Sequence, residues 1–251
     1  KRILLLLSIA LSLCVSSFAI NEKPFTIPEV KEWKGLDGSI ALSGRIIYKG
    51  LEEKKVAQQL ADDYQQLFGK QLTLVQDKAR KGDIILRLKA EKALGEEGYT
   101  MSIHDTPILS ANHRKGLYWA TRTLLQLLEQ HPSHALPRGE IRDTPDYPFR
   151  GVMLDCGRKY FPMSMLRQYV KMLAYYKMNV FHIHLNDNAF QWFYNNDWSR
   201  TPAAFRLESE WFPGLTARDG HYTKHDFIAL QQLADSLGIE VIPEIDVPAH
   251  C

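Results

Sequence analysis

Apolar residues follow two different patterns along the chain. From residue 21 to about residue 145, strand-like runs are "SIALSGRIIY", "QLTLVQ", "DIILRL" and "YTMSIH". Helical spacing predicts one helix that ends at Gly69 and a second around residues 117–130. The mixture predicts a small α+β domain of strands covered by helices. Its sequence holds no cluster of acids, histidines or cysteines that would indicate a site.

After Arg150 strands and helices alternate. The runs "GVMLDC", "NVFHIHL" and "IEVIPEID" predict strands, and "SMLRQYVKMLAYYK" and "TKHDFIALQQLADSLG" predict the helices between them. Such units form parallel sheets, either in an open doubly wound fold or in a (β/α)8 barrel. The proline-containing stretch "LPRGEIRDTPDYPF", residues 136–149, is typical of a connection between the two regions.

Polar residues distinguish between these two folds. Residues two apart on a strand share a face, so His182 and His184 point the same way, as do Glu244 and Asp246. An open sheet covered on both faces would be more evenly apolar, whereas the catalytic rim of a barrel collects polar residues at the carboxyl ends of its strands. The pattern favours the barrel, because polar residues gather at those ends: Asp155, His184, Asn186, Asp187, Asp246 and His250.

The first 19 residues, "KRILLLLSIALSLCVSSFA", are typical of a signal peptide, with two basic residues, an apolar run and a small-residue end. The run is shorter than the ~20 residues that span a bilayer, so we expect no stable membrane span. The segment predicts export to the periplasm or the extracellular space, with lipid attachment at Cys14 as an alternative. After cleavage only Cys156 and Cys251 remain, too few for a disulfide framework.

Composition and charge limit the classes of molecule that this protein is expected to bind. The 251 residues are 45% hydrophobic and 24% charged, as in globular proteins. The net charge is +2, and no dense Lys/Arg block follows the first two residues, which argues against nucleic acid as a partner. We therefore expect a signal peptide over residues 1–19, an α+β domain over 20–145 and a second domain over 146–251.

Four ordered blocks carry a resemblance to a known family: "IRDTPDYPFR", "RGVMLDCGRKYFP", "YYKMNVFHIHLNDN" and "GHYTKHDFIALQQLADSLGIEVIPEIDVPAH". They resemble the family 20 glycoside hydrolases, the β-N-acetylhexosaminidases. The resemblance implies an α+β N-terminal domain followed by about three βα units of a (β/α)8 TIM barrel. It also implies removal of terminal β-linked N-acetylglucosamine or N-acetylgalactosamine from a glycan, with no metal or organic cofactor.

In that family the catalytic Asp–Glu pair follows the "PEIDxPxH" block. The 102 residues from 150 to 251 contrast with the ~250 typical of a barrel, so we expect the chain to be the N-terminal part of a longer protein. The implied mechanism is substrate-assisted and retaining. The Glu protonates the departing oxygen, and the substrate's own acetamido oxygen attacks the anomeric carbon. Water then opens the resulting oxazolinium ion, with the Glu acting as base.

The resemblance also implies roles for residues of this chain. It implies that Arg150 binds the hydroxyl groups of the sugar, because the guanidinium presents its N–H donors as a fork. It also implies that Asp246 orients that arginine. Asp187 and His250 match the pair that supports the catalytic acid, where a carboxylate can fix the tautomer of an imidazole. From the residues alone, we expect Asp155 and Arg158 to pair with each other as structure of the rim.

Several alternatives remain open at this stage. Glu244 suits a buried ion pair as well as a contact to substrate. His182 and His184 have the spacing of metal ligands, which would suit a metal-dependent barrel hydrolase, and a non-catalytic glycan-binding relative is the other alternative. The long loop over residues 188–221 departs from the family's "HLTDDQGW" pattern. Its aromatic residues suit either stacking on sugar rings or packing on the barrel: Phe190, Trp192, Phe193, Trp198 and Trp211.

Overall fold

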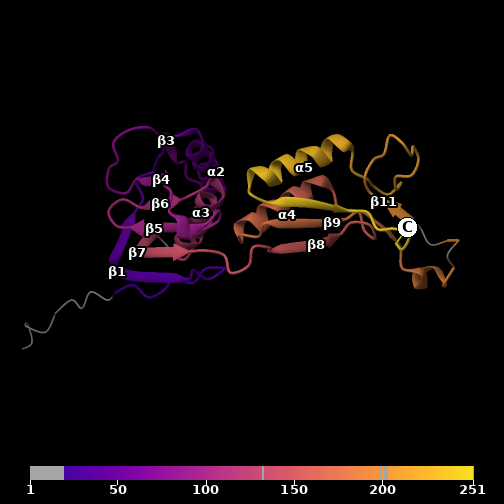
Figure 1. Cartoon of the computed structure of the whole chain (residues 1–251), viewed down its shortest axis with the longest axis horizontal. Coiled ribbons are helices and arrows are strands. Elements are labelled where there is room, and N and C mark those ends of the chain that lie inside the picture. The colour runs from indigo at the N-terminus through magenta and orange to yellow at the C-terminus, as the bar shows by residue number, and fades with distance from the viewer. Residues whose placement is uncertain (1–19, 132, 198, 201–202, 251) are drawn as a thin grey trace, which may run out of the picture. The chain divides into compact units, whose positions relative to one another are not determined.

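The computed structural model describes residues 20–131, 133–197, 199–200 and 203–250 (Figure 1). The predicted signal segment with Cys14, and also Trp198 and Cys251, lie outside the described residues. The chain forms two compact units. The first comprises Lys1–Arg87, Thr100–Ser110 and Leu124–Asp143, and the second comprises Leu88–Tyr99, Ala111–Thr123 and Thr144–Cys251. In the described part of the chain, no helix combines the length and the apolar character needed to cross a bilayer.

A seven-stranded sheet forms the base of the first unit, with the strand order β1-β7-β5-β6-β4-β2-β3. The strands are β1 (Glu32–Ala41), β2 (Arg45–Ile47), β3 (Thr73–Val75), β4 (Ile84–Leu88), β5 (Tyr99–Ile103), β6 (Ile108–Ala111) and β7 (Ala135–Asp143). Helix α2 (Leu51–Phe68) buries the face that carries Val56, Leu60 and Tyr64, and it ends at Gly69, whose φ of +67° a glycine adopts readily. Helix α3 (Arg114–Glu129) follows β6, and a short helix η1 (Lys92–Leu94) follows β4. The whole of η1 and the part of α3 up to Thr123 belong to the second unit. The mixture of strands and helices predicted from the sequence is confirmed.

Strand β7 corrects the prediction that residues 136–149 connect the two regions. The first half of this stretch, residues 136–142, pairs with β1 in an antiparallel ladder that runs from Ala135 to Arg142. Pro137 lies opposite Ser39, beside a shift of register in β1. A proline is tolerated at such an irregularity, because its missing N–H breaks little of the ladder there. The prolines therefore indicated a boundary too early, and the strand continues to Asp143.

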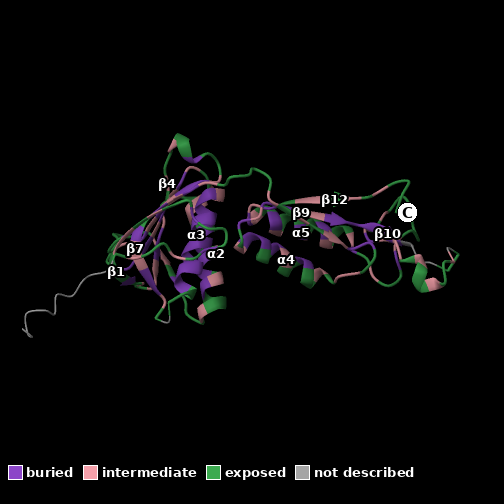
Figure 2. Ribbon diagram, turned by 90° about the horizontal axis from the view of Figure 1, so that it is seen from below, coloured by how far each residue is buried: buried purple, intermediate pink, exposed green. Residues whose placement is uncertain are grey.

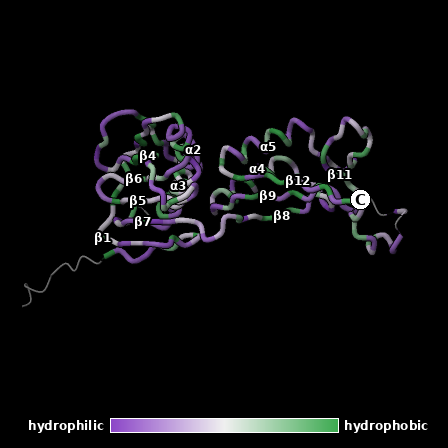
Figure 3. The backbone as a smooth tube through the Cα atoms, in the orientation of Figure 1, coloured by the Kyte–Doolittle hydropathy of each residue, from purple (hydrophilic) through white to green (hydrophobic). Residues whose placement is uncertain are grey.

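The second unit contains a parallel sheet with the order β12-β9-β8. Its strands are β8 (Gly151–Asp155), β9 (Val180–His184) and β12 (Glu240–Glu244), and α4 (Met163–Tyr175) and α5 (Lys224–Ser236) lie between them in sequence. These are the strands and helices that the alternating pattern predicted. Figure 2 shows buried residues along β9, and Figure 3 shows hydrophobic segments along α4, α5 and β12.

The helices cover one face of this parallel sheet. Phe181 and Ile183 of β9 are fully buried, and the ring of Phe181 stacks on Tyr169 of α4 with 5.9 Å between ring centroids. The other face carries Met153, which is 57% exposed, and His182 in register beside it. The strand residues therefore alternate as the period of two requires. The histidines of β9 lie on the face that the helices do not cover.

The connection from β9 to α5 holds the remaining elements of the second unit. Strands β10 (Asn186–Asn188) and β11 (Ala203–Phe205) pair antiparallel, with the short helix η2 (Gln191–Tyr194) between them. Helix α5 begins after Thr223, whose Oγ1 accepts a hydrogen bond from the backbone N–H of Asp226 at 3.1 Å. Asp187, one of the predicted site residues, lies in β10.

Candidate active site

The carboxyl ends of the three parallel strands bring polar side chains to one edge of the sheet. The ladders place Asp155 of β8 and Glu244 of β12 on either side of His184 of β9. The segments that leave these strands supply Arg158, Asp187, Asp246 and His250. We call these seven residues the strand-end cluster. In parallel α/β folds, ligands bind at this edge of the sheet.

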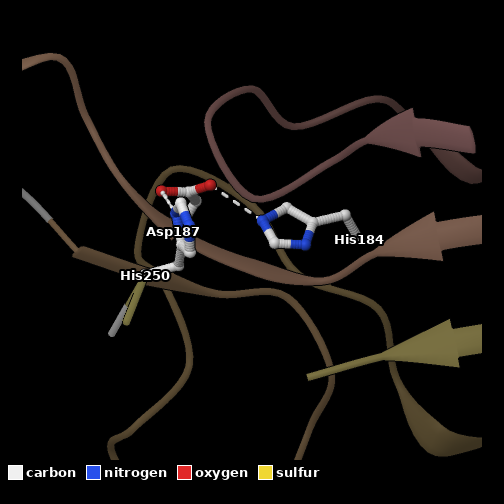
Figure 4. Close-up of side chains that lie close together, drawn as sticks. All are labelled: His184, Asp187 and His250. Atoms are coloured by element: carbon white, nitrogen blue, oxygen red, sulfur yellow. Dashed lines mark hydrogen bonds and ion pairs between the residues drawn. The ribbon is translucent and has the colours of Figure 1, made fainter. Parts of the chain in front are cut away.

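Asp187 is the centre of the strand-end cluster, and it is only 2% exposed. Its Oδ2 lies 2.8 Å from His184 Nε2 and 2.9 Å from Arg158 Nη2 (Figure 4). Its Oδ1 lies 3.1 Å from His250 Nδ1 and accepts the backbone N–H of Asn188 at 2.7 Å. Burial alone would raise the pKa of Asp187, but the bonds from His184 and His250 and the charge of Arg158 lower it below the ordinary value. Asp187 is therefore an ionised carboxylate, and each of its oxygens has hydrogen-bond or ion-pair partners.

His184 bridges two carboxylates. Its Nε2 contacts Asp187, and its Nδ1 contacts Glu244 Oε1. Burial opposes the charge on this ring, yet the bonds to Asp187 and Glu244 raise the pKa of His184 above its ordinary value. A neutral imidazole has a single N–H and cannot donate to both carboxylates, whereas an imidazolium can. His182 contacts the other oxygen of Glu244, so both histidines meet one carboxylate, and Glu244 takes part in an ion pair.

The pH dependence of stability tests whether His184 is protonated in the folded protein. Because the pKa of His184 is raised in the folded protein, the charged imidazole adds to the free energy of unfolding. This contribution is complete below the ordinary pKa of ~6.5 and is lost as the pH rises through the raised pKa. We expect the difference in Tm between the intact wild-type protein and its His184→Gln variant to be largest near pH ~5.5 and to narrow toward pH ~9. Scanning calorimetry across this range measures it. A difference that stays constant, or widens with pH, would show that His184 is neutral.

Asn186 holds the chain segment that follows β12. Its side-chain nitrogen donates to the carbonyls of Asp246 at 2.8 Å and His250 at 2.9 Å, and its Oδ1 accepts the N–H of Asp246 at 2.7 Å. His250 has a φ of +60°, an uncommon conformation for a residue with a Cβ. Its ring presents Nδ1 to Asp187 and Nε2 toward Asp246, 3.7 Å from Oδ2. The structure therefore brings together Asp187 and His250, which the sequence predicted as a pair, and adds Asp246, which the sequence had paired with Arg150.

Arg158 is a member of the strand-end cluster that the sequence did not assign to the site. The expected pair with Asp155 is confirmed, with Nη1 2.6 Å from Oδ2. The guanidinium also pairs with Asp187 and lies 3.5 Å from His250 Nδ1. The turn before it needs Gly157, because a Cβ there would lie 2.7 Å from the backbone of residues 186 and 187.

Arg206, which follows β11, fixes that turn from the other side. It is 1% exposed, and it donates to the carbonyl oxygens of Cys156 at 2.7 Å and Gly157 at 3.0 Å. It also forms a two-pronged pair with Asp219, at 2.6 and 3.1 Å, which lowers the pKa of that carboxyl. A cavity of about 570 Å³ lies beside this turn, lined by Arg158, Tyr194, Thr216, Arg218 and other residues of the loop.

Arg150 does not lie in the strand-end cluster. It precedes Gly151, the first residue of β8, so the five-residue strand, roughly 16 Å long, separates it from Asp155. Its guanidinium donates to the carbonyl oxygens of Lys177 at 2.9 Å and Tyr147 at 2.8 Å, and it pairs with Glu97. The expected arrangement, with Arg150 beside Asp246 at the sugar, is therefore corrected.

Comparisons with known proteins agree with this geometry. A model of glycosyl hydrolase family 20, catalytic domain, matches residues 147–251, and a model of domain 2 of the same family matches residues 23–144. Together the two models account for nearly the whole described chain. The chain belongs to glycosyl hydrolase family 20. As a family 20 chain, it has the sheet of β8, β9 and β12 and the whole strand-end cluster within the part that matches the catalytic domain.

Individual family 20 relatives are similar over large parts of this chain. A beta-hexosaminidase of Akkermansia muciniphila is 35% identical over 144 residues, which are 57% of this chain and 29% of the relative. A beta-hexosaminidase of Vibrio furnissii is 32% identical over 191 residues, 67% of this chain and 29% of the relative. The structure of a Streptomyces plicatus N-acetyl-beta-hexosaminidase, in complex with Thio-NAglucal, covers 92% of this chain with a TM-score of 0.77 and 26% identity. The chain spans 48% of that structure.

The family 20 chain also has residues of the metal-ligating type in the strand-end cluster. Among the residues that the structure describes, His184, Asp187 and His250 offer ligand atoms within 4.8 Å of one another. However, Arg158 already places a positive charge 2.9 Å from Asp187, so a cation there would meet a like charge. The alternative pair, His182 and His184, is bound to Glu244. The geometry is that of a hydrogen-bonded cluster around a carboxylate.

Proposed function

We propose that the protein to which this chain belongs is a β-N-acetylhexosaminidase, which removes terminal β-linked N-acetylglucosamine or N-acetylgalactosamine from glycans. The observation that carries the proposal is the strand-end cluster, in which a guanidinium, a buried carboxylate and an imidazole meet at the edge where parallel α/β folds bind substrates. Membership of family 20 supports it. We further propose that β8, β9 and β12 are the first strands of a (β/α)8 barrel.

Arg158 takes the sugar-gripping role in this proposal, in place of Arg150. Its side chain is 31% exposed, so it is accessible while Asp155 and Asp187 hold it in place. A guanidinium fixed on one side by carboxylates presents its remaining N–H groups in a defined direction, which suits neighbouring sugar hydroxyls. The carbonyl contacts of Arg150 leave it at the other end of β8.

Asp187 and His250 take the supporting role. Asp187 Oδ1 accepts from His250 Nδ1 at 3.1 Å, which fixes the tautomer and leaves Nε2 on the far side of the ring. That nitrogen is 3.7 Å from Asp246 Oδ2, and the His250 side chain is 42% exposed. We propose that Nε2 of His250 positions the catalytic Glu, which protonates the departing oxygen and later acts as base while the substrate's acetamido group attacks. By the family pattern, that Glu lies outside the 251 residues of this chain.

An activity assay on the intact protein tests the proposal. We expect release of p-nitrophenol from p-nitrophenyl N-acetyl-β-glucosaminide with retention of anomeric configuration, as followed by NMR. Activity should be unchanged by EDTA and inhibited by a thiazoline that mimics the cyclic intermediate. Inversion of configuration would exclude the substrate-assisted mechanism. Loss of activity with EDTA, restored by a divalent metal, would instead favour a metal site at His184, Asp187 and His250.

The glycan-binding alternative differs in one measurement. A non-catalytic relative would bind N-acetylglucosamine through Arg158 but would release no p-nitrophenol. Calorimetric titration with N-acetylglucosamine, beside the activity assay, therefore separates the two functions. Binding without turnover in the intact protein would show that the protein is a lectin-like glycan binder and not an enzyme.

A further inference from the structure

A row of alternating imidazoles and carboxylates runs into the strand-end cluster. Its members contact one another in the order His182, Glu244, His184, Asp187 and His250. In Figure 4, Asp187 lies between the rings of His184 and His250. We call these five residues the histidine–carboxylate row. It ends at His250, whose Nε2 positions the catalytic Glu in the proposed mechanism.

His184 is the member of the row that joins Glu244 to Asp187. It is 5% exposed, its Nε2 lies 2.8 Å from Asp187 Oδ2, and its Nδ1 contacts Glu244 Oε1. Both ring nitrogens donate when the ring is an imidazolium. Glu244 is itself held in place, because its other carboxylate oxygen contacts His182. Glu244 therefore stabilises a positive charge on His184, at a position where solvent screens that charge little.

The surroundings of His184 are acidic. Carboxylates face its ring from three segments: Asp155 of β8, Asp187 of β10 and Glu244 of β12. The other charged or titratable side chains of the row and the strand-end cluster are His182 of β9, Arg158 of the turn after β8, and Asp246 and His250 of the segment after β12. Arg158 pairs with Asp155 and Asp187. A charged His184 therefore balances part of the remaining negative charge.

Asp187 transmits the charge of His184 to His250. Its Oδ2 faces two cationic groups, His184 at 2.8 Å and Arg158 at 2.9 Å, whereas its Oδ1 faces His250 at 3.1 Å. The cations at Oδ2 offset part of the negative charge that Asp187 exerts on His250 and on a carboxyl group beyond it. Without the charge on His184 this place would be more negative, and a neighbouring carboxylic acid would lose its proton only at a higher pH.

We propose that His184 and Glu244 are positioning residues that act through Asp187 and His250 to set the pH range in which the catalytic Glu keeps its proton. This rests on the proposed function, and it extends the supporting pair of Asp187 and His250 by two residues from the ends of β9 and β12. Glu244 holds the charge on His184, and that charge acts on the catalytic Glu. The pH dependence of catalysis is the property that these two residues control.

The pH profile of kcat/KM in the intact enzyme tests this. Its alkaline limb reports the pKa of the essential acid in the free enzyme. The substrates are disaccharides with N-acetylglucosamine β-linked to N-acetylglucosamine, galactose or mannose, because a departing sugar hydroxyl needs the proton more than p-nitrophenol does. His184→Gln removes a positive charge, so the limb should move to higher pH. One charge about 10 Å away, at an effective dielectric constant of ~20–40, corresponds to a shift of roughly half a pH unit to one pH unit.

Glu244→Gln removes a negative charge from the same pair, so the limb should not move to higher pH. It should stay in place if His184 loses its proton in this variant, and move to lower pH if Asp187 alone keeps His184 charged. The double variant His184→Gln, Glu244→Gln has no net change of charge, so its limb should return to the wild-type position. His225→Gln is the matched control, since His225 is exposed in the first turn of α5, and it should leave the profile unchanged.

The proposal is overturned if the alkaline limb of His184→Gln stays at its wild-type position or moves to lower pH. An upward shift in Glu244→Gln, a double variant that keeps the shift of His184→Gln, or an equal shift in His225→Gln also overturns it. Variants that lose Tm and rate but keep the wild-type profile would mean that His184 and Glu244 only support the strand ends. If His184→Gln alone fails to fold, Glu244→Gln and the double variant are judged by the same criteria. Wild-type enzyme that cleaves no disaccharide overturns the proposed function instead, whereas the charge of His184 is tested separately by the dependence of Tm on pH.

Discussion

Arg158→Lys should lower kcat/KM of the intact enzyme by about 100-fold. Lysine keeps the charge but has no fork, so it cannot contact Asp155, Asp187 and a sugar at the same time. A hydrogen bond to a charged group contributes about 1.5–3 kcal/mol, and about 1.4 kcal/mol corresponds to a factor of ten in rate. Steady-state kinetics on the p-nitrophenyl substrate measure this, and KM should rise together with the fall in kcat.

Arg150→Lys is the control with the same chemical change at the other end of β8. It removes contacts to the carbonyl oxygens of Tyr147 and Lys177, so we expect a lower Tm with little change in kcat/KM. If Arg150→Lys instead lost activity without a change in Tm, and Arg158→Lys remained active, the sequence-based assignment of Arg150 would be right.

Asp187→Asn should have an effect of the same order or larger. The two carboxylate oxygens of Asp187 contact four groups, namely His184, Arg158, His250 and the backbone N–H of Asn188. An amide keeps only one of these acceptor oxygens. Positioned proton transfer contributes about 10²- to 10⁴-fold to catalysis, so we expect kcat to fall by at least about 100-fold. KM should also rise, because Asp187 holds Arg158. Circular dichroism at the assay temperature establishes that the variant is folded.

His250→Ala separates the two roles of Asp187, which holds both Arg158 and His250. It should lower kcat with a smaller change in KM, since His250 is proposed to act on the catalytic Glu and not on the sugar. In the double variant, the loss in kcat should be little worse than in the poorer single variant, as expected for residues that act as a unit. Losses that multiply independently would mean that Asp187 and His250 make separate contacts.

Strand periodicity and local motifs were enough to predict much of the strand-end cluster. The period of two placed His182 and His184 on one face, and the ladders put Glu244 at the level of His184. Asp187 lies three residues after the end of β9, and His250 lies six residues after the end of β12. Both are near strand ends, which is where a barrel rim collects polar residues. The shared face and the positions near strand ends needed only the strand positions and the direction of the chain, whereas the level of Glu244 beside His184 comes from the ladder in the structure.

Arg158 could not be assigned in the same way. It lies in a turn whose course depends on Gly157 and on Arg206, and Arg206 is 50 positions from the carbonyl oxygen of Cys156 that it holds. No local pattern contains that contact. Arg150 drew attention because it opens the "RGVMLD" block, but a strand start is the wrong end of a parallel sheet for a ligand.

The most direct test of the sugar site is a crystal structure of the intact protein with a bound N-acetylglucosamine thiazoline. We predict that the sugar lies at the carboxyl ends of β8, β9 and β12, with the guanidinium of Arg158 within hydrogen-bond distance of its hydroxyls and with Asp187 still bound to Arg158 and His250. A sugar bound away from these strand ends, or held by Arg150 while Arg158 contacts only Asp155 and Asp187, would contradict the proposed site.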